Sequence, residues 1–338
     1  MINKKNLSKK CKFLLGQWKE NLNLTNFEKK KFEGTLNQLH FQIQKFDKKE
    51  LQVSVCGRVG VGKSSLLNAL IEKQVFQTDL INGSTKTTQS YEWYKRCKNF
   101  NKVELIDLPG IDEINNINEE EFNFNYLLNT DLILFVIDSD MTRIDLIAIE
   151  KLLRHKKPIL IVLNRCDQWS KKEAKLILSS IHKKLSIYNH KIKIVLVASS
   201  PRKARIQRDG TVRSEQKAPK VDTLKGELQD IINQSGELLL CINSLRIADQ
   251  FYKLLKESRL LKKKKVAQSL IGKYAAIKAS GVAINPFLMI DLATGIAFDS
   301  ALVIQLSKLY GLEVGGPTAR QLVKKLSVQN SLLGGAQI

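Results

Sequence analysis

One stretch of eight residues restricts the fold of this chain more than any other feature of its sequence. Residues 57–64 read Gly-Arg-Val-Gly-Val-Gly-Lys-Ser. Residues 51–56 before it alternate in polarity like a β-strand, and residues 65–70 after it begin a helical pattern. The spacing G-x-x-x-x-G-K-S between a strand and a helix is that of a P-loop, which indicates an α/β nucleotide-binding domain.

The residue types of this loop suit a polyphosphate. Glycines let the backbone curl so that its N–H groups point at phosphate oxygens, and the next helix adds the positive end of its dipole. We expect Lys63 to bridge the β- and γ-phosphates and the Ser64 hydroxyl to bind Mg²⁺. The predicted phosphate-binding set is Gly57, Gly60, Gly62, Lys63, Ser64 and Ser65.

The overall composition is that of a globular protein with a basic charge excess. The chain has 338 residues, of which 43% are hydrophobic, and this suffices for two or three domains with sizeable cores. Its formal net charge is +22. The excess fits either an anionic partner, such as RNA or an acidic membrane surface, or a compositional bias that specifies no site.

The cysteines, the histidines and the N-terminal region bear on the compartment. The five cysteines are scattered without a C-x-x-C pair, and the four histidines lack metal-ligand spacing. We therefore expect no disulfide framework and no metal other than Mg²⁺. Because no N-terminal apolar run is long enough for a secretory signal, we expect a cytoplasmic location, with peripheral attachment to the cytoplasmic face of the inner membrane as the alternative.

Hydrophobic periodicity divides the chain into three predicted regions. Residues 1–50 have the period of one or two amphipathic helices. Residues 51–235 alternate apolar strands with amphipathic helices, which predicts an α/β G domain with a mostly parallel six-stranded sheet and helices on both faces. Residues 236–338 are expected to be a helical domain. The strands are predicted at residues 51–56, 91–97, 103–107, 132–138, 158–163 and 192–197, and the intervening helices at 63–72, 119–129, 142–153, 171–185 and 221–233.

One segment inside the α/β region lacks periodicity. Residues 200–220 are rich in Arg, Lys, Gly and Pro and are predicted to form a long basic loop. Such a loop is either a phosphate or RNA contact or a solvated insertion.

A second helical region starts after residue 236, with a predicted helix at 238–261, and becomes more apolar toward the end of the chain. Asn285-Pro286 is typical of a helix start and Gly311 of its end. Asp291 and Asp299 interrupt the apolar run. Residues 266–310 are therefore a buried helical hairpin, an interfacial membrane contact, or an inserted segment whose two carboxylates pair.

The sequence after the P-loop predicts how a bound nucleotide is sensed. Residues 103–106 run as a strand into Asp107-Leu108-Pro109-Gly110. We expect Asp107 to hold Mg²⁺ through water and Gly110 to offer its N–H to the γ-phosphate. This segment would then respond to the presence of the γ-phosphate.

A later motif predicts the base. The strand at 159–163 ends in Asn164-Arg165-Cys166-Asp167, where guanine-specific P-loop proteins carry N-K-x-D. The Asp167 carboxylate can accept hydrogen bonds from guanine N1–H and the 2-amino group, which adenine does not present in that arrangement. Arg165 can still place its plane over the base. The predicted base-binding set is Asn164, Arg165, Asp167, Ser199 and Ser200.

These motifs, in this order, resemble those of the translation-factor-related GTPases and are most similar to the Era and TrmE branch. The resemblance covers residues 57–200. Residues 86–89, Lys-Thr-Thr-Gln, are similar to the switch I element of that branch, which implies Thr88, or alternatively Thr87, as a second Mg²⁺ ligand. It also implies catalysis of GTP hydrolysis by Lys63, Thr88 and Gly110, and a homodimer through the G domain as one partner arrangement.

Two departures from that pattern limit what the resemblance implies. Ile111 occupies the position of the water-orienting Gln of Ras-like enzymes, and Gly60 that of the Asn in potassium-activated members. We therefore expect a low intrinsic rate and no potassium stimulation. Asp112 and Glu113 are expected to be solvated residues of the second switch segment rather than catalytic groups.

The C-terminal region has its own likeness. Residues 285–291 and 306–311 resemble the YcjF-type helical domain of unknown function, which is often suspected of membrane association. The sequence thus predicts a slow switch that binds GTP, GDP and Mg²⁺. One alternative is a non-hydrolytic, GTP-dependent module that binds an acidic membrane through residues 236–310. The other is a ribosome-assembly GTPase, although no KH-type G-x-x-G segment follows the G domain.

Overall fold

The computed structural model divides the chain into two compact units, Met1–Asp249 and Gln250–Ile338. The predicted domain limits after residues 50 and 235 stay predictions. The structure describes residues 7–76, 89–95, 97–112, 124, 126–188, 192–206, 212–282, 288–310 and 315–334.

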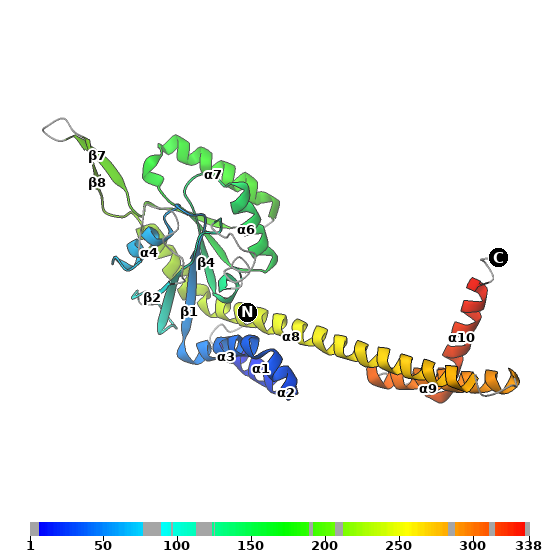
Figure 1. Cartoon of the computed structure of the whole chain (residues 1–338). Helices are drawn as coiled ribbons and strands as arrows, with labels where there is room; N and C mark the ends of the chain where they lie inside the picture. The colour runs from blue at the N-terminus through cyan, green and yellow to red at the C-terminus, as the bar shows by residue number, and fades with distance from the viewer. Residues whose placement is uncertain are drawn as a thin grey trace. The chain divides into compact units, whose positions relative to one another are not determined.

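The first unit is built on a six-stranded sheet in the order β2-β3-β1-β4-β5-β6. All neighbouring strands are parallel except β2, which runs antiparallel to β3. The mostly parallel six-stranded sheet predicted from the sequence is thus confirmed (Figure 1). The strands are β1 (Glu50–Cys56), β2 (Gln89–Glu92), β3 (Lys102–Asp107), β4 (Leu132–Ile137), β5 (Ile159–Leu163) and β6 (Lys193–Leu196).

Helices cover both faces of this sheet because the central strands are apolar on both sides. In β4, Leu134 and Val136 join one buried cluster, whereas Ile133 and Phe135 join another. The first cluster includes side chains of α4 (Lys63–Ile71) and the beginning of α8 (Asp222–Val282). The second includes side chains of α6 (Arg143–Arg154) and α7 (Lys171–Leu185). Two short 3₁₀ helices, η2 (Cys166–Gln168) and η3 (Ser186–Tyr188), flank α7.

Three N-terminal helices pack on the same unit: α1 (Leu7–Glu20), α2 (Asn26–Lys31) and α3 (Glu33–Lys48). Cys11 and Leu15 of α1 and Leu39 of α3 form a buried cluster with Cys241 and Ile247 of α8. These helices bury their apolar faces against another part of the protein, which is the packing that their periodicity favours.

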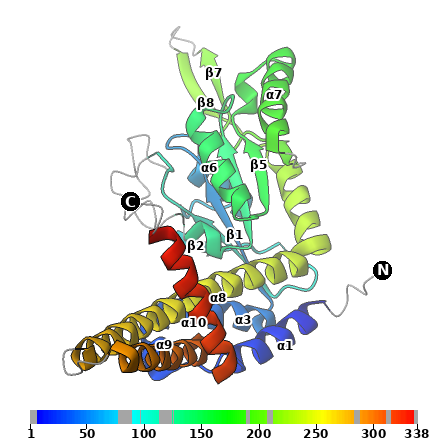
Figure 2. The ribbon, with the colours of Figure 1, turned by 90° about the vertical axis from the view of Figure 1, so that its right-hand side faces the viewer.

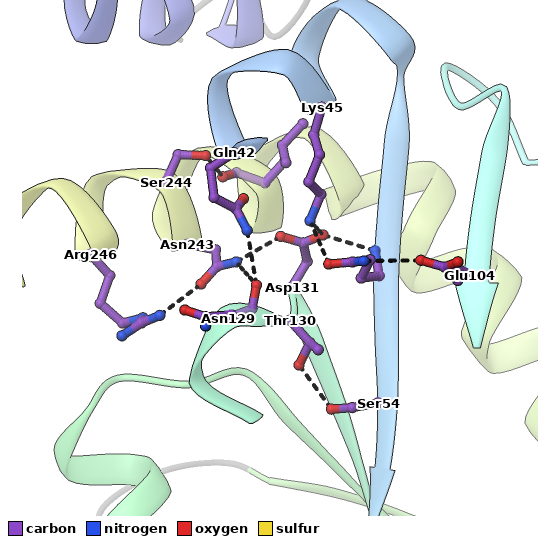
Figure 3. Close-up of polar contacts among 12 residues, drawn as sticks. Gln42, Lys45, Ser54, Glu104, Asn129, Thr130, Asp131, Asn243, Ser244 and Arg246 are labelled. Carbon is purple, nitrogen blue, oxygen red and sulfur yellow. Dashed lines mark hydrogen bonds and ion pairs between the residues drawn. The ribbon is translucent and has the colours of Figure 1, made fainter. Parts of the chain in front are cut away.

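A buried polar cluster joins α3 and α8 to the amino ends of the strands (Figure 3). Lys45 of α3 forms an ion pair with Asp131, 2.5 Å between Nζ and Oδ2, with side chains 1% and 0% exposed. The same carboxylate accepts hydrogen bonds from the backbone N–H of Gln52, at 2.8 Å, and from the Asn243 amide of α8, at 2.9 Å. Asn243 also donates to the carbonyl oxygen of Asn129, at 2.7 Å.

Lysine 157 adds a second buried cation to this cluster. Its ammonium group donates to the Leu128 carbonyl at 3.0 Å and to the Asn243 side-chain oxygen at 3.1 Å. Burial, followed by the nearby Arg246 charge, lowers the pKa of Lys157 well below its ordinary value. Through these contacts, the residues just before β4 hold both flanking helices.

Besides the three helices found in residues 1–50, where one or two were predicted, the structure differs from the predicted elements in three places. Residues 200–220 contain a hairpin of β7 (Arg202–Ile206) and β8 (Val212–Gln216), which projects from the six-stranded sheet (Figure 1, Figure 2). The prediction of a long loop at residues 200–220 was therefore wrong, although the Asp-Gly dipeptide in this segment is a typical hairpin signal. The strand predicted at 91–97 is instead the shorter β2.

The third difference is that α8 continues without a break through Gly236. A side chain at this position would lie 2.5 Å from the Phe100 ring, so glycine lets the helix pack closely on that ring. Gly236 allows close packing and does not end a helix. The break predicted between the helices at 221–233 and 238–261 was therefore wrong.

The second unit contains the remainder of α8 together with α9 (Leu288–Tyr310) and α10 (Gly316–Gly334). The helix predicted near residues 286–310 is present as α9, and Lys263 of α8 lies over the ring of Tyr310, 6.0 Å from its centre. Within the described part of the chain, no helix has both the length and the apolar character needed to span a membrane. The alternative in which Asp291 pairs with Asp299 lies outside the described residues, because the Asp291 side chain is not among them.

Candidate functional site

The predicted P-loop follows β1 at the carboxyl edge of the sheet. Gly57 and Gly62 have φ angles of +148° and +87°, which L side chains rarely adopt. A Cβ at Gly57 would lie 2.2 Å from the Val136 carbonyl oxygen, and one at Gly62 would lie 2.6 Å from the Asn164 amide nitrogen. The loop therefore needs glycine at both positions in order to fit against β4 and the residues after β5.

Lys63 and Ser64 begin α4 directly behind this loop. The Lys63 ammonium group donates to the carbonyl oxygen of Arg58 at 3.0 Å. The Ser64 hydroxyl donates to Oδ2 of Asp107 at 2.6 Å, so the structure brings these two predicted metal-site residues together.

Asp107 is the candidate centre of a cation site. The residue is 1% exposed, and its Oδ1 atom has no hydrogen-bond partner within the described structure. Burial raises the pKa of Asp107, opposed by the Ser64 hydrogen bond and the Lys63 charge. A buried carboxylate oxygen beside a hydroxyl fits Mg²⁺, which prefers oxygen ligands and retains several waters.

The other predicted ligands give no further support to this metal site. Thr88 and its alternative Thr87 lie outside the described residues. No group of three or more His, Cys, Asp or Glu side chains that could hold a metal occurs in the described ranges. Mg²⁺ held by one carboxylate, one hydroxyl and waters needs no such group.

The segment after Asp107 lies against the P-loop. A Cβ at Gly110 would lie 2.4 Å from a Val59 methyl group, so this close approach requires glycine. Ile111 donates its backbone N–H to the Gly57 carbonyl at 3.2 Å, and its side chain packs on the core beneath α6 and α7. Asp112 is exposed as expected, but its carboxylate also accepts the Val59 N–H at 2.7 Å, a contact that the sequence did not predict.

Asn164 joins the P-loop to the predicted base-binding residues. Its amide nitrogen donates to the Val61 carbonyl at 2.9 Å and to the Ser199 hydroxyl at 3.0 Å. Its oxygen accepts the Ser199 backbone N–H at 3.0 Å, and the residue is 1% exposed. The buried Asn164 side chain thus connects the P-loop, the end of β5 and the loop that contains Ser199.

These segments surround a cavity of about 1040 Å³. The cavity is lined by seven of the residues that the sequence predicted for nucleotide binding: Gly62, Ser65, Asn164, Arg165, Asp167, Ser199 and Ser200. Asp167 is exposed at the wall, where its carboxylate can meet a ligand. The volume is in the range of small-molecule and cofactor sites. The other predicted glycines, together with Lys63 and Ser64 of α4 and Asp107 of β3, do not line this cavity.

Several residues at this site had not been predicted from the sequence. Arg202 and Gln216, at the base of the hairpin, line the cavity, as does Lys225 of α8, which forms an ion pair with Glu72 at 2.7 Å. Asp138, directly after β4, pairs with Arg165 at 3.1 Å. The only sequence signal for Asp138 is its place after an apolar strand, because the carboxyl ends of parallel strands share one edge of the sheet.

Comparison with known proteins gives family matches for two segments of the chain. Residues 52–165 match the family described as 50S ribosome-binding GTPase, and residues 246–338 match a domain of unknown function, DUF697. The chain is 30% identical over 117 residues to GTPase Era of Buchnera aphidicola, covering 34% of this chain and 40% of that protein. It is 37% identical over 145 residues to the tRNA modification GTPase MnmE of Helicobacter pylori, covering 41% of this chain and 30% of that protein. The matches span less than half the length of these relatives.

Two solved structures are similar to this chain at lower identity. A variant of Era from Aquifex aeolicus bound to GDP and AlF4⁻ is 23% identical, with 54% of this chain and 56% of that chain covered and a TM-score of 0.41. Toc33 from Arabidopsis thaliana is 19% identical, with 59% and 91% covered and a TM-score of 0.39. On the family matches, residues 52–165 carry a P-loop GTPase domain related to those of Era and MnmE, and residues 246–338 carry a DUF697 domain of the YcjF type.

Proposed function

We propose that this protein binds GTP and GDP with Mg²⁺ at the P-loop and the adjoining cavity, and that it hydrolyses GTP slowly as a switch. The observation that carries this proposal is the position of Asn164, whose hydrogen bonds tie the P-loop to the Ser199 loop. This arrangement supports placing the phosphates at Lys63 and the base at Asp167 in one continuous site.

Each residue has a separate role in this proposal. Lys63 and the loop N–H groups bind the β- and γ-phosphates, and the exposed Asp167 carboxylate accepts hydrogen bonds from the guanine edge. Ser64 and Asp107 would hold Mg²⁺, with Thr88 as the proposed further ligand. When bound, Mg²⁺ neutralises charge that develops on the phosphates. Gly110 offers its backbone N–H to the γ-phosphate and thereby senses its presence.

The slow rate follows from Ile111. This apolar side chain packs on the core cluster of α6 and α7, and it has no polar group that could orient an attacking water. Positioning and electrostatics from Lys63, Mg²⁺ and the backbone N–H groups remain to lower the barrier.

The test is GTP binding and multiple-turnover hydrolysis by the full chain with and without Mg²⁺. Lys63→Ala is expected to abolish tight GTP binding. Lys172→Ala, at an exposed position of α7, serves as the matched control and is expected to leave GTP binding unchanged. Rapid unaided hydrolysis would contradict the slow switch, and unchanged GTP binding by Lys63→Ala would contradict the site.

A second role is favoured by the helical region at 236–338, which we propose as the domain that responds to the nucleotide. On α8, exposed Leu260, Leu261 and Val266 flank the run of four lysines at residues 262–265. Apolar and basic side chains at one place suit an acidic membrane surface. Leu260→Ser/Leu261→Ser is expected to weaken sedimentation with anionic vesicles, with Leu176→Ser on α7 as the control. Equal binding by both variants would remove this role.

A further inference from the structure

We propose that Asp138 is a positioning residue of the guanine-nucleotide site, which fixes Arg165 against the P-loop. This inference rests on the proposed function, since it assigns to Arg165 the task of lying over the bound base. Asp138 was not among the residues that the motifs predict, and it touches neither the cavity nor the predicted metal site.

Asp138 uses its two oxygens on two different arginines. Oδ1 accepts a hydrogen bond from Arg58 of the P-loop at 3.3 Å, and Oδ2 accepts one from Arg165 at 3.1 Å. The Asp138 side chain is only 20% exposed, so these pairs are partly shielded from solvent. A carboxylate that is shared in this way fixes the distance between the P-loop and the base motif.

The other end of Arg58 is anchored on α6. Its Nε lies 3.3 Å and 3.2 Å from the two oxygens of Asp145, whose side chain is fully buried. Asp145 is itself held at the start of the helix, where it accepts the backbone N–H of Thr142 at 2.9 Å and its hydroxyl at 2.7 Å. Arg58 thus connects Asp138 to a rigid helix end.

The other end of Arg165 returns to the P-loop. While one guanidinium nitrogen pairs with Asp138, the second donates to the carbonyl oxygen of Gly60. The guanidinium group carries these donors on separate nitrogens in one plane, so both contacts can form while the face of the plane stays available to a base. A lysine ammonium in this place would have no such face to offer.

The charges of this group sum to zero. Two guanidinium groups, Arg58 and Arg165, stand against two carboxylates, Asp138 and Asp145. Removing the charge of Asp138 leaves the two cations on either side of it without their shared counter-ion. We therefore infer that Arg165 then leaves its place over the base, although the fold around buried Asp145 is retained.

The experiment measures the affinity of the full chain for ribose-labelled GDP. Asp138→Asn is expected to weaken GDP binding roughly tenfold, the size of a lost charge-assisted contact. Asp138→Glu is expected to recover most of the loss. The matched control is Asp140→Asn, two residues farther on, which pairs instead with Lys184 at 2.8 Å. It is expected to bind GDP as the natural protein does.

A double-mutant cycle separates positioning from general stability. In an Arg165→Ala background, adding Asp138→Asn is expected to weaken GDP binding by less than about twofold, because the residue that Asp138 positions is already absent. Equal losses in both backgrounds, or a loss no greater than that of Asp140→Asn, would overturn the inference. If Asp138→Asn does not fold, the test uses Asp138→Glu instead. This variant must then bind GDP more tightly than Arg165→Ala. Failure of the natural protein to bind GDP would instead overturn the proposed function and this inference together.

Discussion

Glycine 62 illustrates how a single residue shapes the site. It precedes α4 with a φ of +87°, and a Cβ there would lie 2.6 Å from the amide nitrogen of Asn164. Moving the Asn164 side chain would cost free energy, because its amide makes three hydrogen bonds in the protein interior. Gly60 has a similar φ of +79° but has nothing within 4 Å of such a Cβ.

The two glycines therefore make a matched pair for a stability prediction. Both Gly60→Ala and Gly62→Ala should lose about 1–2 kcal/mol from the positive φ alone. Gly62→Ala should lose at least about 1 kcal/mol more, because it displaces Asn164. Urea unfolding of both variants measures the difference, and equal losses would show that the contact with Asn164 yields freely.

At the residue scale, the sequence predicted the motif residues but not their cross-contacts. The type and spacing of Gly62, Lys63 and Asp167 already imply phosphate and base binding, and the structure brings the residues of these motifs to one edge of the sheet. The Asp138 bridge could not be predicted, because local spacing does not reveal which arginine a carboxylate will reach after folding. Thr88 stays a prediction outside the described residues.

At the scale of elements, the buried ion pair between α3 and the start of β4 invites a direct test. Lys45 and Asp131 are 1% and 0% exposed, and the carboxylate also accepts bonds from β1 and α8 (Figure 3). Asp131→Ala would leave a buried cation and two buried donors without their acceptor. Removing one partner of such a pair costs about 3–5 kcal/mol.

The control for this prediction is an exposed ion pair between α1 and α3. Lys12 and Asp47 are 40% and 61% exposed, so Asp47→Ala should cost no more than about 1 kcal/mol. Chemical unfolding at one pH compares the two variants. If Asp131→Ala is no less stable than Asp47→Ala, the cluster does not hold α3 and α8 on the sheet.

Periodicity predicted most of the elements and failed where long-range packing decides. The apolar runs at β4 and β5 are strong because both of their faces are buried. Gly236 lies inside the unbroken α8, where a Cβ would come within 2.5 Å of the Phe100 ring, and Phe100 lies far away in the sequence. The hairpin of β7 and β8 has a polar, basic sequence, so hydrophobic periodicity gave no sign of it.

At the scale of the whole molecule, one helix contributes to both compact units. α8 begins in a buried cluster of the first unit and continues past residue 250 into the second unit. The family matches follow this organisation, with a GTPase model at residues 52–165 and DUF697 at 246–338. The sequence motifs predicted both regions. Neither periodicity nor motif spacing reveals which molecule binds the helical region at residues 236–338.

Asp167 is proposed to give the cavity its preference for guanine, and nucleotide competition on an Asp167→Asn variant measures this preference. An Asn side chain offers a donor and an acceptor, which match the C2 carbonyl and N1–H of xanthine instead of the two donors of guanine. The natural protein should bind GTP well ahead of ATP and XTP, and Asp167→Asn should favour XTP over GTP. Equal binding of ATP and GTP by the natural protein, or no gain of XTP binding by the variant, would contradict the claim.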